Sequence, residues 1–392
     1  MGGRIMVEIR RLTMREYPAA VELSDKVFRD ESQKSMGDAF LSVFSPSLGQ
    51  AFGAFADGKL VSFMGLVPAV IHIGEARIKV YSLGSVCTDE DYRGQGLASN
   101  LLDKVLAHVD KAGASLLLVS GERPLYTRVH CHPFGEVDEF LLTRRENFLP
   151  GDDKNSIGAN EKKGVGEYQI REFQATDWLA LHELAQARPV RFEQSVWDLA
   201  GMVHSEPFAS CIHRTHRTWV AEQDGQPVAF AVLGLPYRDR RDLSPLVIEW
   251  AGTAEAVGAI LKFAVATQVN SLTLVLGPHE QEIAAVLSLI PAKRQRNQGT
   301  VRVMEAGRLV QQLRPYLIAR DAHLATEFVA VSMPDGQVEV RLGGEMRVLS
   351  SQQFIAFVFD SPPQTVWTDR MESLRRRLFP VAFPYTAGLN YV

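Results

Sequence analysis

The stretch LGSVCTDEDYRGQGLASNLL, residues 83–102, decides how the N-terminal part of this chain folds. An apolar run leads into it, a polar turn follows at 88–91, and Arg93-Gly94-Gln95-Gly96-Leu97-Ala98 opens a series of apolar residues at helical spacing. The pattern predicts a strand that passes through a glycine-rich turn into an amphipathic helix.

Such a turn is a typical phosphate cradle, because the first N–H groups of a helix are unpaired and lie at its positive end. Gly94 and Gly96 let the backbone approach an anion closely, Ala98 leaves the first helical turn uncrowded, and Arg93 adds a charge. The alternative is a tightly packed strand–turn–helix that binds nothing. A P-loop and a dinucleotide fingerprint are excluded, because Gly-Lys-Ser/Thr and a third glycine are missing.

The composition bounds the class of protein. A chain of 392 residues with 46% hydrophobic and 22% charged residues predicts a globular protein of two or three domains. The formal charge of −4 argues against a nucleic-acid partner. No signal region or membrane-spanning run is present, so we expect no membrane partner.

The three cysteines, Cys87, Cys131 and Cys211, are scattered and odd in number. They predict free thiols in a reducing, cytoplasmic compartment. The tract His130-Cys131-His132 resembles a metal-binding sequence, but neighbouring side chains on a strand or turn point to different sides. Because no second ligand cluster with zinc spacing follows, we predict no metal.

An internal repeat organises the chain. Ile170-Arg171-Glu172-Phe173 matches Ile9-Arg10-Arg11-Leu12, and residues 224–230 match residues 57–63. Where the glycine turn should recur, the second copy reads Ile248-Glu249-Trp250-Ala251-Gly252-Thr253-Ala254-Glu255. Without a glycine pair this copy should hold no pyrophosphate, which predicts one phosphate site per chain.

Local patterns predict the remaining organisation. We expect a capping box from Thr13 to Glu16, hairpin turns at Asp57-Gly58 and Pro334-Asp335-Gly336, and a closing strand at 137–143. Helices are expected at 30–43 and 369–378. The predicted domains cover 1–150, 167–298 and 299–392, with a polar linker at 151–166. The tail 379–392 is aromatic, which predicts that it docks, either in a site or in simple packing.

The strand, the Arg93–Ala98 turn, the long helix, the buried strand at 115–120 and the tyrosine that follows resemble the acetyl-CoA-binding core of the GNAT acetyltransferase superfamily. The duplicated unit with its degenerate second copy resembles the narrower enhanced-intracellular-survival (Eis-like) family, which has a sterol-carrier-like third domain. The resemblance implies an α/β (α+β) fold of tandem GNAT-like mixed sheets plus a C-terminal sterol-carrier-like domain. It also implies a homo-oligomer.

The resemblance implies where acetyl-CoA binds. The strand backbone would bond the acetyl and pantetheine groups, the glycine turn the pyrophosphate, and the end of the next strand would be where cofactor and acceptor meet. The residues so implied are Val86, Cys87, Thr88, Arg93, Gly94, Gln95, Gly96, Leu97, Ala98, Ser99, Gly121 and Glu122. Because the strand acts through its backbone, Cys87 is expected to be a buried thiol and not a nucleophile.

Two catalytic residues are implied. The family's general acid is a tyrosine in a Tyr-x-Arg-x-Gly-Tyr/Phe stretch, which Tyr126 and Arg128 match; His130 and Cys131 replace the last pair. A phenol is protonated at neutral pH and can give its proton to the CoA thiolate, whereas the alternative is a core tyrosine. The family also places a C-terminal carboxylate in the site, which corresponds to Val392.

The expected function is transfer of acetyl from acetyl-CoA to a primary amine by direct attack in a ternary complex. The resemblance implies acceptors such as aminoglycosides, polyamines or lysine side chains. A polycationic acceptor requires acidic residues, for which Asp25, Asp30, Glu31 and Glu122 are candidates. The alternative is a non-catalytic CoA-sensing or lipid-binding protein, which has no need of an acid at Tyr126.

Overall fold

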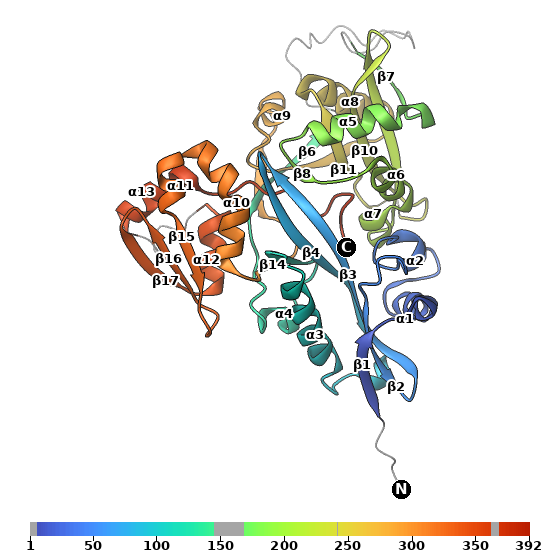
Figure 1. The fold of residues 1–392 in the computed structure, drawn as a ribbon. Coiled ribbons are helices and arrows are strands. Elements are labelled where there is room, and N and C mark those ends of the chain that lie inside the picture. The colour runs from blue at the N-terminus through green and yellow to red at the C-terminus, as the bar shows by residue number, and fades with distance from the viewer. Residues whose placement is uncertain (1–5, 145–167, 241, 362–367) are drawn as a thin grey trace. The chain divides into compact units, whose positions relative to one another are not determined.

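The computed structural model describes residues 6–144, 168–240, 242–361 and 368–392, which form two compact units (Figure 1). Unit 1 comprises Met1–Gly135, Asn297–Phe383 and Val392; unit 2 comprises Glu136–Arg296 and Pro384–Tyr391. Each is built on a mixed sheet with helices, which confirms the expected α/β class. The expected linker at 151–166 lies outside the described residues.

The main sheet of unit 1 has the strand order β1-β2-β3-β4-β5-β14. Neighbouring strands are antiparallel except β4 and β5, which are parallel and joined by the helix α3. The elements are β1 (Val7–Arg11), η1 (Met14–Glu16), α1 (Tyr17–Phe28), α2 (Met36–Ala39), β2 (Phe52–Ala56), β3 (Lys59–Ile73), β4 (Ala76–Thr88), η2 (Glu90–Tyr92), α3 (Leu97–Lys111), β5 (Leu116–Val119), α4 (Pro124–Thr127) and β14 (Thr300–Val303).

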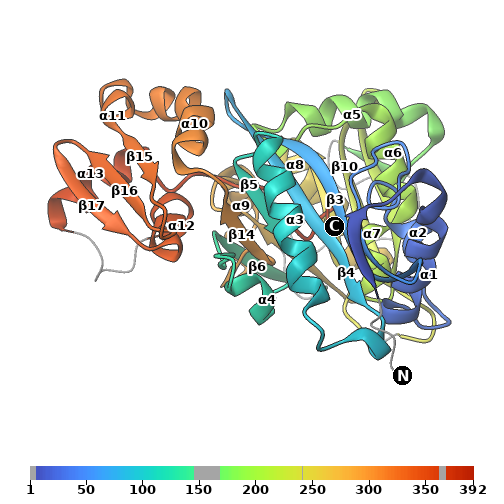
Figure 2. The ribbon, with the colours of Figure 1, turned by 60° about the horizontal axis from the view of Figure 1, so that its bottom comes forward.

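Helix α3 covers one face of this sheet, and α1 lies on the other (Figure 1, Figure 2). The residues that predicted an amphipathic helix, among them Leu101, Val105 and Val109, are fully buried. They pack with Met64 of β3 and other strand residues in one apolar cluster. Burial of this stripe fixes the direction of α3, and therefore the position of the glycine turn that precedes it.

The rest of unit 1, as far as it is described, is a small antiparallel sheet, β15-β16-β17, with helices α10 to α13. The turn at Pro334-Asp335-Gly336 joins β15 to β16, as predicted, and the predicted helix at 369–378 is α13. The elements are α10 (Ala306–Arg320), α11 (Ala322–Glu327), β15 (Val329–Ser332), β16 (Val338–Leu342), β17 (Glu345–Leu349), α12 (Ser351–Phe359) and α13 (Asp369–Leu378).

Unit 2 has the strand order β13-β6-β12-β11-β10-β9-β7. Its succession β11–α8–β12 parallels β4–α3–β5 of unit 1, with β11 and β12 again parallel. The elements are β6 (Glu136–Thr143), β7 (Gln169–Glu172), η3 (Ala175–Asp177), α5 (Trp178–Ala187), β8 (Val190–Phe192), α6 (Val196–Ser205), α7 (Pro207–Cys211), β9 (Arg214–Gln223), β10 (Gln226–Pro236), β11 (Leu246–Gly252), α8 (Ala254–Thr267), β12 (Ser271–Leu276), α9 (Gln281–Val286) and β13 (Ala292–Arg296).

The two units exchange a strand, which the sequence did not predict. The strand expected to close the first domain is present as β6, but it pairs with β12 and β13 of unit 2. Strand β14 pairs with β5 in unit 1 instead. The compact units therefore differ from the expected division at 150 and 298. An antiparallel strand from either copy can form the backbone hydrogen bonds at the edge of β5 or of β12. Backbone pairing alone therefore does not determine which copy supplies the strand.

Equivalent local structures confirm the internal repeat. Asp57-Gly58 and Asp224-Gly225 both form two-residue turns with positive φ, joining β2 to β3 and β9 to β10. The predicted capping box at Thr13 and Glu16 is present, and its counterpart links Gln174 and Asp177.

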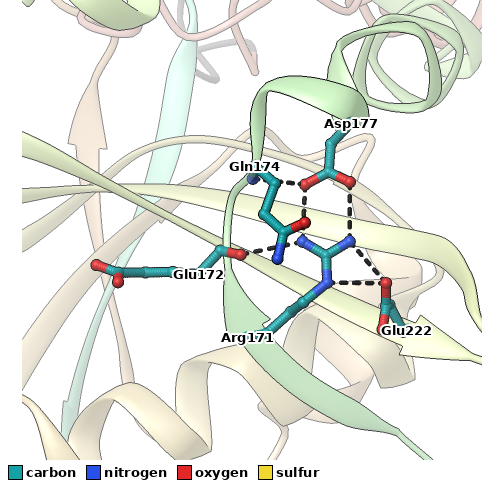
Figure 3. A network of polar contacts seen from close by, with 5 residues as sticks. All are labelled: Arg171, Glu172, Gln174, Asp177 and Glu222. Atoms are coloured by element: carbon teal, nitrogen blue, oxygen red, sulfur yellow. Dashed lines mark hydrogen bonds and ion pairs between the residues drawn. The ribbon is translucent and has the colours of Figure 1, made fainter.

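An arginine ties the first strand of each copy to the helix that follows. Arg10 binds Glu16 through two hydrogen bonds of 2.8 and 2.9 Å, and Arg171 binds Asp177 through two of 2.7 and 2.8 Å. Arg171 also bonds Glu222 on β9 (Figure 3). This shared geometry explains why the repeated Ile-Arg pair is detectable in the sequence.

The predicted helix at 30–43 was wrong in extent, since only α2 (Met36–Ala39) is α-helical there. Side chains occupy the backbone groups that a longer helix would use. Asp30 accepts from the N–H of Ser32 at 2.9 Å, and Asp25 accepts from the N–H of Met36 at 2.6 Å. Such local bonds compete with helix formation.

We expect Asp177→Asn to destabilise unit 2 by about 2 kcal/mol, because it breaks charged hydrogen bonds of a buried carboxylate to Arg171. The hydrogen bonds from Arg171 hold the pKa of Asp177 below its usual value. Its stabilisation is therefore present above the unfolded pKa of about 4 and is lost as the pH falls. Thermal unfolding at pH 7 and pH 3 measures this. Glu172→Gln, at the exposed pair with Arg217, is the control and should change stability by less than about 1 kcal/mol.

Candidate active site

Strand β4 carries a bulge just before the glycine turn. Gly84 pairs with Gly65 and Cys87 with Phe63, so Ser85 and Val86 face one residue of β3. Ser85 takes the left-handed φ of 51°, which is uncommon for a residue with a side chain. Such bulges interrupt the ladder and redirect the strand, and they are frequent beside active sites.

The pairing of β4 with β5 ends just before the bulge in β4. Their parallel ladder runs from Val80 with Leu116 to Leu83 with Val119 and ends there, although β4 continues to Thr88. Because β5 ends at Val119, the last residues of β4 have no parallel partner. The carboxyl ends of neighbouring parallel strands, next to the N-terminus of the connecting helix, are where ligands bind in many α/β proteins. The bulge, Val86 and the glycine turn therefore belong to one end of the sheet.

The predicted glycine turn is present as an exposed loop. Gly94 and Gly96 have φ of 75° and 77°, and a Cβ atom on either would meet nothing within 4 Å. Gly96 is the N-cap of α3, and no side chain caps the helix. The first N–H groups of α3, at Leu97, Ala98 and Ser99, thus have no intrahelical acceptor. Arg93 is exposed and donates to the carbonyl of Thr88 at 3.2 Å.

The groups around Cys87 determine its reactivity and which part of β4 can bond a ligand. Burial raises the pKa of the Cys87 thiol to about 12, so the side chain is protonated and unreactive at neutral pH. The Ser62 hydroxyl donates to the Cys87 carbonyl at 2.9 Å and lies 2.7 Å from the Thr88 hydroxyl. Because these groups are partnered, the bulge at Val86 is the part of β4 best placed to bond a ligand.

Tyr126 lies against the end of β5. A Cβ atom on Gly121 would be 3.3 Å from the Tyr126 ring, and the Gly121 carbonyl accepts from the Thr300 hydroxyl at 3.1 Å. Tyr126 is 6% exposed, and burial raises its pKa to about 12. The phenol is therefore protonated across the physiological range. Glu122, the other residue predicted here, is exposed.

The loop after Tyr126 contains His130 and Cys131, which replace the Gly-Tyr/Phe pair of the family stretch, and side-chain contacts fix its position. His130 adopts φ 63°, a conformation that glycine takes readily, while Cys131 is buried. Both His130 and His132 contact the Ser351 hydroxyl, at 3.2 and 3.0 Å. Arg302 donates to the carbonyl of Val129. Within the described parts of the chain, no group of three or more His, Cys, Asp or Glu is placed to hold a metal ion.

Val392 lies against the bulged strand β4 at Gly84, a contact that the sequence did not indicate. A Cβ atom on Gly84 would be 2.5 Å from the carboxyl carbon of Val392 and 2.6 Å from its Cγ1. Only glycine at position 84 leaves room for this contact. The C label stands beside β3 and β4 in both views (Figure 1, Figure 2). Gly84 and Ser62 are the residues of this region that sequence reasoning missed.

Of the acidic residues predicted to bind the acceptor, two are engaged in local hydrogen bonds and two are exposed. Asp25 accepts from the Ser35 hydroxyl at 2.8 Å as well as from the backbone near α2, and Asp30 accepts from Ser32. Both are therefore engaged in local structure. Glu31 and Glu122 are exposed.

Comparison with known proteins agrees with this geometry. Residues 8–133 match the family model of the acetyltransferase (GNAT) domain, and β4, the glycine turn and Tyr126 lie within the matched residues. The match supports acyl transfer as the kind of chemistry. A search of curated proteins found no significant match.

Solved structures resemble the whole chain. A probable N-acyltransferase of unknown function from Enterococcus faecalis V583 is 13% identical, with a TM-score of 0.64 over 97% of this chain and 98% of that one. A GCN5-related N-acetyltransferase from Kribbella flavida is 16% identical (TM-score 0.59, 99% of both chains). Eis1 from Mycobacterium abscessus is 12% identical (TM-score 0.56, 90% and 89%). At these identities the likeness establishes the shared fold.

Proposed function

We propose that this protein is an acetyl-CoA-dependent N-acetyltransferase that acetylates a primary amine in a ternary complex. The observation that carries the proposal is the combination, within the stretch that matches the GNAT domain, of a bulged β4 that continues past the end of β5, an uncapped glycine turn and a buried, protonated Tyr126. A pure CoA-binding protein needs the first two features but has no use for an acid.

In the proposed complex the pyrophosphate lies on the N–H groups of 94–99, with Arg93 adding charge. The pantetheine arm follows the end of β4 at Val86, Cys87 and Thr88, where the bulge at Val86 offers the backbone groups, and ends between the bulge and Gly121-Glu122. The N–H of Val86 polarises the thioester carbonyl.

The chemistry follows from these positions. The neutral amine attacks the thioester carbon, the C–S bond breaks, and Tyr126 gives its proton to the sulfur of CoA. The proton that the nitrogen loses returns through solvent and restores the phenol. The carboxylate of Val392, a weak base, holds the ammonium form of the acceptor or orients a water that takes its proton.

The experiment is a thiol-release assay with acetyl-CoA and a panel of aminoglycosides, polyamines and lysine peptides, with product mass as the readout. We expect acetylated amine and free CoA in equal amounts. Tight CoA binding without turnover on any amine favours the CoA-sensing or lipid-binding alternative instead. The sterol-carrier-like third domain and the homo-oligomer stay predictions. Among the described helices, none is long and apolar enough to cross a bilayer.

Gly96→Ala tests the pyrophosphate site. A methyl group at φ 77° costs about 1 kcal/mol of backbone strain and lies where the phosphate must approach, so we expect CoA affinity to fall about 10-fold. Isothermal titration with CoA measures this. Gly113→Ala is the matched control, because Gly113 has φ 74° just past the other end of α3. It should carry the same strain and leave CoA affinity unchanged. Equal losses in both variants would remove the turn from the site.

A further inference from the structure

Unit 2 contains a crevice at the position equivalent to the acetyl-CoA site proposed in unit 1. Strands β11 and β12 pair at Leu246 and Thr273 and then diverge, and α8 begins directly after β11. The crevice lacks a glycine turn, and the Thr253 side chain caps α8 by accepting from the N–H of Ala256 at 3.4 Å. These differences remove the features that would favour a phosphate.

A partly buried ion-pair network connects β11 to the segment that follows β12. Arg188 binds Glu249 of β11 and Glu280, which follows β12, and also donates to the Trp250 carbonyl at 3.1 Å. Its guanidinium carbon lies 4.6 Å from the centre of the Trp250 ring. One guanidinium thus faces two carboxyl groups, and burial raises the pKa of Glu249 above its usual value.

A cavity of about 610 Å³ remains beside this network, which is within the range of small-molecule sites. Apolar side chains form most of its wall, including Leu184, Ala187, Val228, Trp250, Ala254 and Ile283.

The polar side chains of the wall are Arg188, Thr253 and, from the segment after β12, His279, Glu280, Gln281 and the exposed Glu282. Among the described residues, the buried Nδ1 atom of His279 has no hydrogen-bond partner. Burial lowers the pKa of His279, so this ring is neutral and adds no positive charge to the wall. The wall therefore combines apolar side chains with the carboxylates of Glu280 and Glu282 and the single guanidinium of Arg188.

We propose that this cavity of unit 2 binds an organic ammonium ligand with an apolar or aromatic body. The two carboxylates of the wall outnumber its one guanidinium and therefore disfavour anions, and the apolar side chains accommodate the body. The site is separate from the proposed acetyl transfer, because all the residues that line it belong to unit 2.

The experiment is isothermal titration of the full chain with three probes of one shape: 2-phenylethylammonium, 2-phenylethanol and phenylacetate. We expect the ammonium to bind with a dissociation constant of about 0.1–1 mM, as suits so small a ligand, and phenylacetate at least about 30-fold more weakly. Equal affinity for ammonium and phenylacetate, or no binding of the ammonium, overturns the proposal.

Ala187 locates the binding. Ala187 is exposed, ends α5 and lines the cavity, so Ala187→Trp should fill the cavity without disturbing the core. We expect this variant to weaken ammonium binding at least about 10-fold and Ala187→Ser to leave it unchanged. Glu282→Gln should weaken it about 3-fold. If Ala187→Trp binds as tightly as the parent, the ammonium binds elsewhere, such as the acceptor site of unit 1, and the proposal fails. A thiol-release assay on the same variants tests the proposed acetyltransferase separately.

Discussion

Tyr126→Phe is expected to lower turnover of acetyl-CoA with an amine by about 10²–10³-fold, the usual contribution of a positioned acid. The substitution removes only the phenolic hydroxyl and keeps the buried ring against Gly121. Without a proton donor, the CoA thiolate must leave as an anion. Steady-state assay at pH 7 measures the effect, and CoA titration should show an unchanged dissociation constant.

Tyr81→Phe is the matched control for this result. Tyr81 is another buried tyrosine of the same apolar cluster, with a pKa raised by burial, and its hydroxyl donates to Gln50 at 3.2 Å. Its loss should cost about 1 kcal/mol of stability and no turnover. If Tyr126→Phe keeps full activity, Tyr126 is a core tyrosine and another group supplies the proton.

Gly84→Ala is the second large effect that we expect. Its methyl group would lie 2.5 Å from the carboxyl carbon of Val392 and 3.1 Å from the oxygen, so the end of the chain must move. If the Val392 carboxylate positions the acceptor, a displacement of about 1 Å can lower kcat about 10²-fold. Affinity for CoA should change little, because the glycine turn is unaffected.

Deletion of Tyr391 and Val392 should reproduce the loss of kcat with the same small change in CoA affinity. Gly234→Ala is the control, because Gly234 lies in β10 and its methyl group would meet only side-chain carbons, the nearest 3.1 Å away at Ile248. It should keep normal turnover. An unchanged rate in both Gly84→Ala and the deletion would remove Val392 from the proposed mechanism.

The parts of the fold that local chemistry governs could be predicted from the sequence. The glycine turn before α3, the capping box at Thr13 and the hairpins at Asp57 and Pro334 each depend on residues within a few positions of one another. The prediction of a helix at 30–43 was wrong in extent, and the cause is also local in sequence, since Asp25 and Asp30 accept hydrogen bonds from nearby backbone groups.

The residues of the candidate site likewise fall into those that local sequence predicts and those that depend on distant contacts. Arg93 to Ser99 and Tyr126 are placed by a continuous strand–turn–helix–strand succession, and the spacing of residues reveals it. The roles of Ser62 and Gly84 depend on the register of β3 against β4, which shifts at the bulge beside Met64. No periodicity in the sequence marks that shift.

The sequence by itself determined that this chain holds a repeated α/β unit, that one copy has a glycine-rich turn before its helix, and that the other lacks it. Those properties reside in short-range patterns of glycine, charge and apolar spacing. Only the tertiary structure decided that β6 and β14 are exchanged, that Val392 meets Gly84, and that Arg188 fills the crevice of unit 2. Each of these joins residues distant in the chain, and such contacts are selected by the free energy of packing and pairing the whole unit.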